Sequence, residues 1–183
     1  MARVVEVAPE RLAGWLSRFA AKNPDPGAAQ RISACEEFSH DPLAVLLVRR
    51  GGYAVGLAGG STFRDSKVGT RHVQSRTAAG GWSQQRFARR RSNQADELVR
   101  AVAAHSARLL ALDHAPQGLV VGGDRSLVRD VLEDPRLAHL LDLPRRELYD
   151  LPDPRRSVLE EALRRGRAVR VTIEDDPPAP LTS

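Results

Sequence analysis

The chain has 183 residues, 42% of them hydrophobic, so it is long and apolar enough for one domain with its own core and is not disordered throughout. No apolar run approaches the roughly 20 residues of a membrane-spanning helix, the N-terminus lacks a signal-peptide pattern, and Cys35, the single cysteine, excludes an internal disulfide. The net charge is +5, and nearly all of the positive residues are arginines, which suit bidentate contacts with phosphate. We expect a cytoplasmic protein. The net charge alone does not decide whether the partner is anionic, because a GC-rich genome favours arginine codons as well.

The first 42 residues are predicted to form one helix and a connector. Apolar residues between positions 9 and 22 recur at helical spacing, and Asn23–Pro24 is typical of a helix end. Residues 24–42 are rich in proline and have no periodic pattern, so we expect a connector without regular structure.

Three strands and a long helix are predicted next. The apolar runs 43–48 and 53–58 are each followed by a glycine pair, as in β-hairpins. A third strand, long and partly polar, is expected over about 61–76. Residues 77–84 have no periodicity, and the strongest helical pattern of the chain follows over about 85–113.

The rest of the chain alternates short strands and helices. Asp124 is placed to cap a helix, and Gly166 is expected to end another. The predicted elements are a strand over 118–122, a helix over 126–132, a helical turn over 137–141, a strand over 146–151, a helix over 157–165 and a strand over 168–173. This order predicts an α/β fold with a mixed β-sheet and flanking helices. We expect one domain over residues 1–174, with its core over 43–123 and a disordered tail over 175–183.

The residues that most clearly suggest a functional site lie just before the long helix and in its first turns. This segment contains GGWSQQRFARRR over residues 80–91. Adjacent glycines permit unusual backbone conformations and close approach to another molecule, and glutamine amides donate and accept hydrogen bonds without charge. Arginines near a helix N-terminus are disfavoured by the helix dipole by only ~0.3–1 kcal/mol each. This pattern is typical of phosphate binding by the arginines and the helix end together, and equally of a solvated basic surface.

This string resembles the loop of class I translation termination factors of the eukaryotic and archaeal type. In that loop Gly-Gly-Gln is followed by Ser, by Arg-Phe-Ala-Arg and by a long helix. The closer resemblance is to the bacterial (actinobacterial) branch of the Vms-like release-factor-like family of peptidyl-tRNA hydrolases, over about residues 43–123. It implies an RNase H-like fold of the release-factor central-domain type. It also implies hydrolysis of the peptidyl-tRNA ester on stalled or split large ribosomal subunits, as in ribosome rescue and translation quality control.

The resemblance also implies the site residues. Trp82 stands where the termination factors have their glutamine, so the reactive amide is expected from Gln84, or from Gln85 if the alignment shifts by one residue. Gly80 and Gly81 would let the loop over 77–85 enter the ribosomal peptidyl-transferase centre, which would complete the site without a cofactor or metal. A neutral glutamine is a poor base, so its role would be to position water. The residues expected to bind RNA are Arg71, His72, Arg76, Trp82, Arg86, Arg89, Arg90 and Arg91.

Two other functions remain open at this point. One is a non-catalytic RNA-binding or ribosome-binding module. The other is a tRNA 3′-end nuclease, whose chemistry needs several carboxylates around two metal ions. The first core strand carries no carboxylate, and Asp65, Asp124 and Asp130 do not lie at the expected strand ends. The expected partners are large-subunit ribosomal RNA and peptidyl-tRNA, with no membrane. The sequence leaves the oligomeric state open, and we expect a monomer.

Overall fold

The protein is described by a computed structural model over residues 1–24, 30–70, 83–111 and 115–175, with the backbone alone for residues 83–93. Where the sequence was expected to form one domain over 1–174, the chain divides into two compact units. The smaller unit contains residues 1–39 and the segment from Arg164 onward, and the larger contains 40–163. Within the described ranges, no helix is long and apolar enough to cross a membrane.

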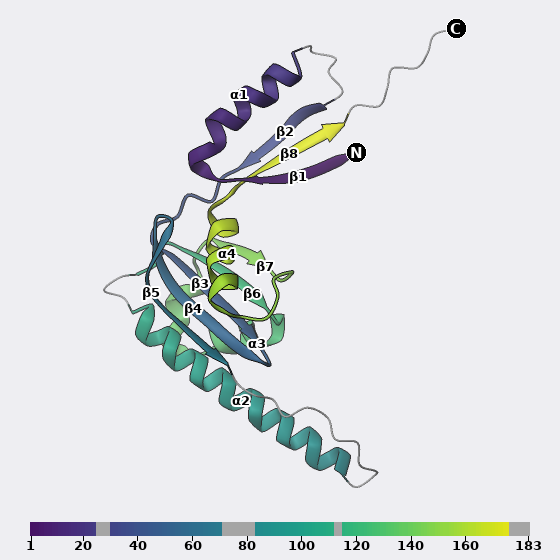
Figure 1. The fold of residues 1–183 in the computed structure, drawn as a ribbon. Coiled ribbons are helices and arrows are strands. Elements are labelled where there is room, and N and C mark those ends of the chain that lie inside the picture. Colours follow the sequence, from purple (N-terminus) through teal and green to yellow (C-terminus); the bar gives the residue numbers. More distant parts are fainter. Residues whose placement is uncertain (25–29, 71–82, 112–114, 176–183) are drawn as a thin grey trace. The chain divides into compact units, whose positions relative to one another are not determined.

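The larger unit is built on a five-stranded mixed sheet of order β5-β4-β3-β6-β7 (Figure 1). β4 is antiparallel to β3 and β5, whereas β6 is parallel to β3 and to β7. The strands are β3 (Leu43–Arg49), β4 (Gly52–Gly59), β5 (Thr62–Thr70), β6 (Gly118–Gly123) and β7 (Arg145–Leu148). Four strands, β3, β5, β6 and β7, therefore run in the same direction. The mixed sheet with flanking helices confirms the predicted fold class.

The apolar face of the long helix α2 (Ser83–Leu109) packs against one side of this sheet. Leu98 and Val102 share a core with Leu46 and Val48 of β3 and with Leu119 of β6. The same core contains residues of α3 (Arg125–Leu132) and of the 3-10 helix η3 (Pro135–Leu140). Neighbouring residues of β3 point to opposite faces, yet all six from Leu43 to Val48 are buried, so both faces of the central strand are covered.

The smaller unit is a three-stranded antiparallel sheet of order β1-β8-β2 with helix α1 packed on it. Val7, Val169, Val171 and Ile173 form its core, and Trp15 and Phe19 of α1 stack on each other with ring centroids 5.4 Å apart. Its elements are β1 (Ala2–Val7), η1 (Pro9–Arg11), α1 (Leu12–Lys22), β2 (Gln30–Glu36) and β8 (Val169–Asp175). The predicted helix over 9–22 is confirmed.

The structure corrects several sequence predictions for the two ends of the chain. β1 was not predicted at all, and β2 lies within the predicted connector 24–42. β8, expected in the mixed sheet, pairs with both of these strands instead. Helix α4 (Arg156–Arg167) continues through Gly166, which is buried, rather than ending there. β8 extends to Asp175, and the rest of the predicted tail, 176–183, lies outside the described residues.

Candidate functional site

The glycine-rich segment connects β5 to α2. β5 ends at Thr70 and α2 begins at Ser83. Gln84 and Gln85 were expected in the loop over 77–85, but the helix includes both of them. The backbone of Arg86, Arg89, Arg90 and Arg91 is also helical, and the side chains of all these residues lie outside the described part. The predicted site residues Arg71, His72, Arg76, Gly80, Gly81 and Trp82 also lie outside the described residues.

The helical start at Ser83 changes what Gln84 and Gln85 can offer chemically. The first four N–H groups of an α-helix, counted from its cap residue, have no intrahelical acceptor, and in α2 these include the N–H groups of residues 83–85. The helix dipole adds a partial positive charge at the same end. Each candidate glutamine therefore contributes a backbone N–H directed at the helix N-terminus in addition to its side-chain amide. Such an end binds anionic oxygen without any cofactor.

The first turns of α2 extend past the sheet, as Figure 1 shows. Leu98 is the first buried residue among those of α2 whose side chains are described. It follows Ser83 by 15 residues, which at 1.5 Å per residue corresponds to about 22 Å of helix. The C-terminal half of α2 packs in the core, and this packing anchors the helix whose N-terminal half projects beyond the sheet. Of the arginines expected to bind RNA, Arg86, Arg89, Arg90 and Arg91 lie on the projecting half.

The segment that carries the glycines leaves the sheet at a defined edge, which we call the carboxyl edge, where β3, β5, β6 and β7 end. Thr70 of β5 pairs with Gly52, and Gly52 pairs with Arg49 of β3. On the other side of β3, Val48 pairs with Gly123 of β6. In α/β sheets, this is the edge at which loops and ligands gather.

Gly123 allows β3 and β6 to approach closely at this edge. Its φ is +102°, and an added Cβ would lie 2.1 Å from the carbonyl oxygen of Val48. That carbonyl also accepts a hydrogen bond of 2.7 Å from the backbone N–H of Asp124. Only glycine combines this backbone angle with this close contact, so Gly123 sets where the following helix begins.

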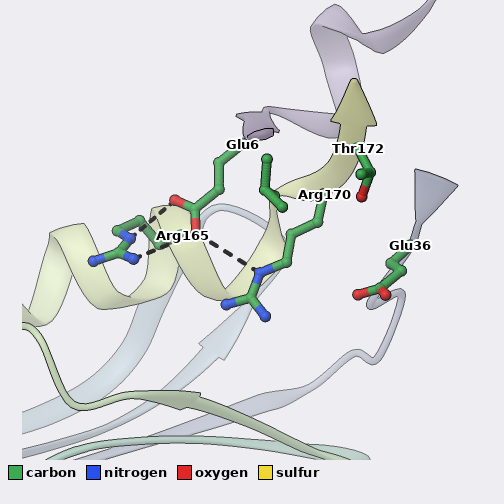
Figure 2. A pocket seen from close by; sticks show the side chains of 6 residues that line it. Glu6, Glu36, Arg165, Arg170 and Thr172 are labelled. Carbon is green, nitrogen blue, oxygen red and sulfur yellow. Dashed lines mark hydrogen bonds and ion pairs between the residues drawn. The ribbon is translucent and has the colours of Figure 1, made fainter. Parts of the chain in front are cut away.

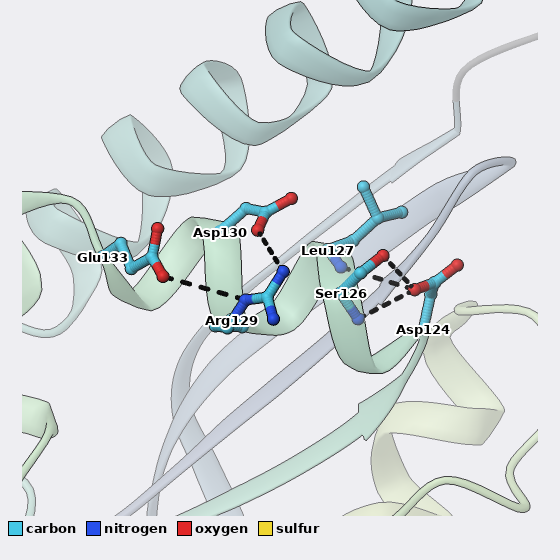
Figure 3. Close-up of polar contacts among 6 residues, drawn as sticks. All are labelled: Asp124, Ser126, Leu127, Arg129, Asp130 and Glu133. Carbon is cyan, nitrogen blue, oxygen red and sulfur yellow. Dashed lines mark hydrogen bonds and ion pairs between the residues drawn. The ribbon is translucent and has the colours of Figure 1, made fainter.

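Asp124 caps α3, as the sequence predicts. Its Oδ1 accepts hydrogen bonds from the backbone N–H and the hydroxyl of Ser126, at 3.0 and 2.8 Å, and from the N–H of Leu127 at 3.4 Å (Figure 3). The hydroxyl of Ser126 is the main cause of the lowered pKa of Asp124; the two backbone N–H groups and the charge of Arg50 lower it further, and burial opposes them. The carboxylate therefore acts as the N-terminal cap of α3.

The described residues contain no site of the kind that metal-dependent nuclease chemistry requires. Within these ranges no group of three or more His, Cys, Asp or Glu side chains is placed to hold a metal ion. Asp65 accepts a hydrogen bond of 2.7 Å from the N–H of Ser66, and Asp130 lies 3.4 Å from Arg129. With Asp124 used as a cap, the three candidate carboxylates serve separate local contacts.

Sequence reasoning missed a polar pocket in the smaller unit, shown in Figure 2. The pocket measures about 540 Å³ and is lined by Val4, Glu6, Glu36, Arg165, Arg170 and Thr172. Glu6 of β1 accepts a hydrogen bond of 2.9 Å from Arg165, and Arg170 lies 3.8 Å away on its other side. This network ties β1 to β8 and to the end of α4. The sequence gives no sign of this pocket, because its lining residues come together only when β1 pairs with β8.

Comparisons with known proteins give a family match and similar solved structures. No curated protein matches the chain. Among solved structures, the archaeal translation termination factor aRF1 is 18% identical, with a TM-score of 0.41 over 66% of this chain. This chain covers 32% of that protein, about a third of its length. The profile of the Actinobacteria/chloroflexi VLRF1 release factor family matches residues 41–172, which include the GGWSQQRFARRR segment and exceed half of the chain. The protein therefore belongs to the Actinobacteria/chloroflexi VLRF1 release factor family.

Proposed function

We propose that this protein is a peptidyl-tRNA hydrolase that releases nascent peptides from tRNA on stalled or split large ribosomal subunits. The observation that carries the proposal is the release-factor family match across a glycine-glutamine motif that opens a long helix. In this proposal the partners are large-subunit ribosomal RNA and peptidyl-tRNA. The reaction takes place in the cytoplasm and needs no cofactor beyond the ribosome.

The proposed mechanism uses neutral hydrogen-bond donors at the start of α2. When water attacks the ester, its oxygen bonds to the carbonyl carbon, and negative charge develops on the carbonyl oxygen and then on the departing 3′-oxygen. The N–H and side-chain amide of Gln84 can stabilise these oxygens and orient the water, and Gln85 is the alternative. The ribosomal RNA around the peptidyl-transferase centre supplies the rest of the site and the route for the proton.

The proposal assigns the arginines of α2 to RNA binding. Arg89 and Arg90 follow Arg86 by three and four residues, which places the three positions on one side of the helix. With Arg91 they are on the half of α2 that projects beyond the sheet. Phosphates along an RNA backbone can be held there by charge-assisted, bidentate contacts. Arg71, His72, Arg76 and Trp82 complete the proposed RNA contacts.

A single-turnover release assay tests this mechanism. The full chain is mixed with large subunits that carry labelled peptidyl-tRNA, and the rate of peptide release is measured. Gln84→Ala should lower the rate by about 10²–10³-fold, the usual loss of one oxyanion donor, without weakening binding to the subunits. Gln85→Ala is tested in parallel to distinguish the two amides.

Gln94→Ala is the matched control, because Gln94 is another glutamine of α2 outside its first turns. It should release peptide at the rate of the unmodified protein. If Gln84→Ala and Gln85→Ala also release at that rate, the mechanism is wrong. If the protein binds subunits in a salt-dependent manner but releases nothing, it is a non-catalytic RNA-binding module.

A further inference from the structure

Apart from the motif, the carboxyl edge of the larger unit carries an arginine that is stacked on a tyrosine. Arg125 is the first residue of α3, directly after the Gly123–Asp124 turn, and Tyr149 follows the end of β7. The guanidinium carbon of Arg125 lies 3.9 Å from the centre of the Tyr149 ring. Its Nη1 lies 3.2 Å from a carboxylate oxygen of Glu147.

This pair leaves a planar cation open to solvent. The side chain of Arg125 is 72% exposed although one side of it rests on the ring. Burial, assisted by the charge of Glu147, raises the pKa of the Tyr149 phenol, so the ring stays neutral at physiological pH. Stacked guanidinium planes and aromatic rings are the surfaces on which proteins receive unstacked RNA bases.

Arg50 adds an available charge at the same edge. It directly follows β3 and is exposed. Its side chain forms no hydrogen bond or ion pair with any residue in the described ranges. Its field reaches Asp124, whose pKa it helps to lower, so it is close to the start of α3. An exposed guanidinium in this state can bind phosphate in bidentate fashion.

The carboxylates of this edge are engaged by groups of the chain. Asp124 caps α3, Glu147 pairs with Arg125, and Asp153 lies 3.9 Å from Arg49. Asp150 also has an interaction within the chain. Among the described residues of this edge, Arg50 and the open face of Arg125 therefore remain available to an anionic, aromatic partner.

We propose that Arg50, Arg125 and Tyr149 form a second RNA-contact site, in which Arg125 stacks an unpaired base and Arg50 binds an adjacent phosphate. The inference rests on the proposed function, because the glycine-rich segment leaves the sheet at this edge. The site would fix the orientation of the larger unit on ribosomal RNA while the start of α2 reaches the ester. Its residues act in binding and do not touch the reacting atoms.

The test measures the affinity of the full chain for vacant large ribosomal subunits over a range of salt concentrations. Arg50→Ala should weaken binding and lower the slope of log K against log salt by about 0.7–0.9, the value for one lost phosphate contact. Arg125→Lys keeps the charge and can still pair with Glu147 but loses the planar stack. It should weaken binding by about tenfold, in the range of one lost base-stacking contact, with the slope unchanged.

Arg129→Ala is the matched control. Arg129 is on the same helix, has a side chain that is 69% exposed, and contacts Asp130 and Glu133 (Figure 3). It should bind subunits like the unmodified protein. The inference is overturned if Arg125→Lys and Arg50→Ala bind normally, or if Arg129→Ala weakens binding as much as Arg50→Ala, because the effect would then be one of general charge.

The outcome is separable from that of the release assay. Arg50→Ala and Arg125→Lys should weaken binding to vacant subunits, where no ester is present, whereas Gln84→Ala should bind these subunits normally and release peptide slowly. If the unmodified protein releases no peptide, the proposed hydrolase activity is wrong, but the binding result still stands. Normal binding by both arginine variants would remove this site and leave the hydrolase activity intact.

Discussion

Replacing Asp124 with alanine removes the cap that starts α3. The carboxylate accepts three hydrogen bonds there, and α3 cannot shift to compensate because four of its eight residues are buried in the core. Loss of a side-chain cap costs about 0.5–2 kcal/mol. The charge also interacts favourably with the helix dipole, by about 0.3–1 kcal/mol. We expect Asp124→Ala to lower the free energy of unfolding by about 1–2 kcal/mol at neutral pH.

The same change has a predicted dependence on pH. The pKa of Asp124 is lowered in the folded chain, first by the Ser126 hydroxyl. A carboxyl group with a lowered folded pKa stabilises the fold at pH values above its unfolded pKa. This stabilisation is lost as the pH falls through the folded pKa. The stability difference between the unmodified protein and Asp124→Ala should therefore be largest near pH 7 and shrink below about pH 4.

Urea unfolding followed by circular dichroism at pH 7 and pH 3.5 measures both effects. Asp124→Asn is the control, because asparagine caps helices about as well as aspartate but carries no charge. It should retain most of the stability and lack the pH-dependent part. Equal stability of Asp124→Ala and the unmodified protein at pH 7, or a difference that grows as the pH falls, would refute this reasoning.

Two further predictions concern stability and are checked by thermal and chemical unfolding. Gly123→Ala should cost more than about 3 kcal/mol, because both the backbone angle and the Val48 carbonyl oppose a side chain. Gly60→Ala, at φ +60° in open space, should cost only about 1–2 kcal/mol, and equal losses would contradict the role of the close contact. The hydroxyl of Ser106 is buried and has no hydrogen-bond partner among the described residues. Ser106→Ala should therefore leave stability unchanged or raise it by up to about 1 kcal/mol, and a loss above 1 kcal/mol would show that the hydroxyl is satisfied.

Local patterns carried most of the fold prediction for the larger unit. The runs that became β3 and β4 are apolar throughout because both strands are buried, and the glycines between them mark the turn. The cap of α3 could also be predicted, since Asp124 directly precedes a helical pattern. These signals depend on neighbours in sequence, which is why they could be recognised without the structure.

The smaller unit could not be predicted in the same way. Every residue of β2 from Ser33 to Glu36 is exposed, so the strand shows no alternation of apolar and polar residues. β1 pairs with β8, from the other end of the chain, with Ala2 opposite Glu174. Such a pairing depends on tertiary contacts that no local pattern reports. Without these strands, β8 was assigned to the larger sheet.

The candidate site was only partly accessible to sequence reasoning. The motif pointed to Gln84 and Gln85, whereas the helical start at Ser83 adds their backbone N–H groups to the available donors. The contact between Arg125 and Tyr149 was missed because it depends on the parallel pairing of β6 with β7, which brings residues from two separate turns to one edge. Spacing along the chain gives no sign of that contact.

The most direct test of the central claim examines both products of one reaction. The unmodified protein is incubated with large subunits that carry peptidyl-tRNA labelled on the peptide and on the tRNA, and the products are separated on one gel. Ester hydrolysis predicts free peptide together with tRNA of full length and an intact 3′ end. A shortened tRNA, with the peptide still attached to the short 3′ fragment that was cut from it, would contradict the account and identify a tRNA-end nuclease.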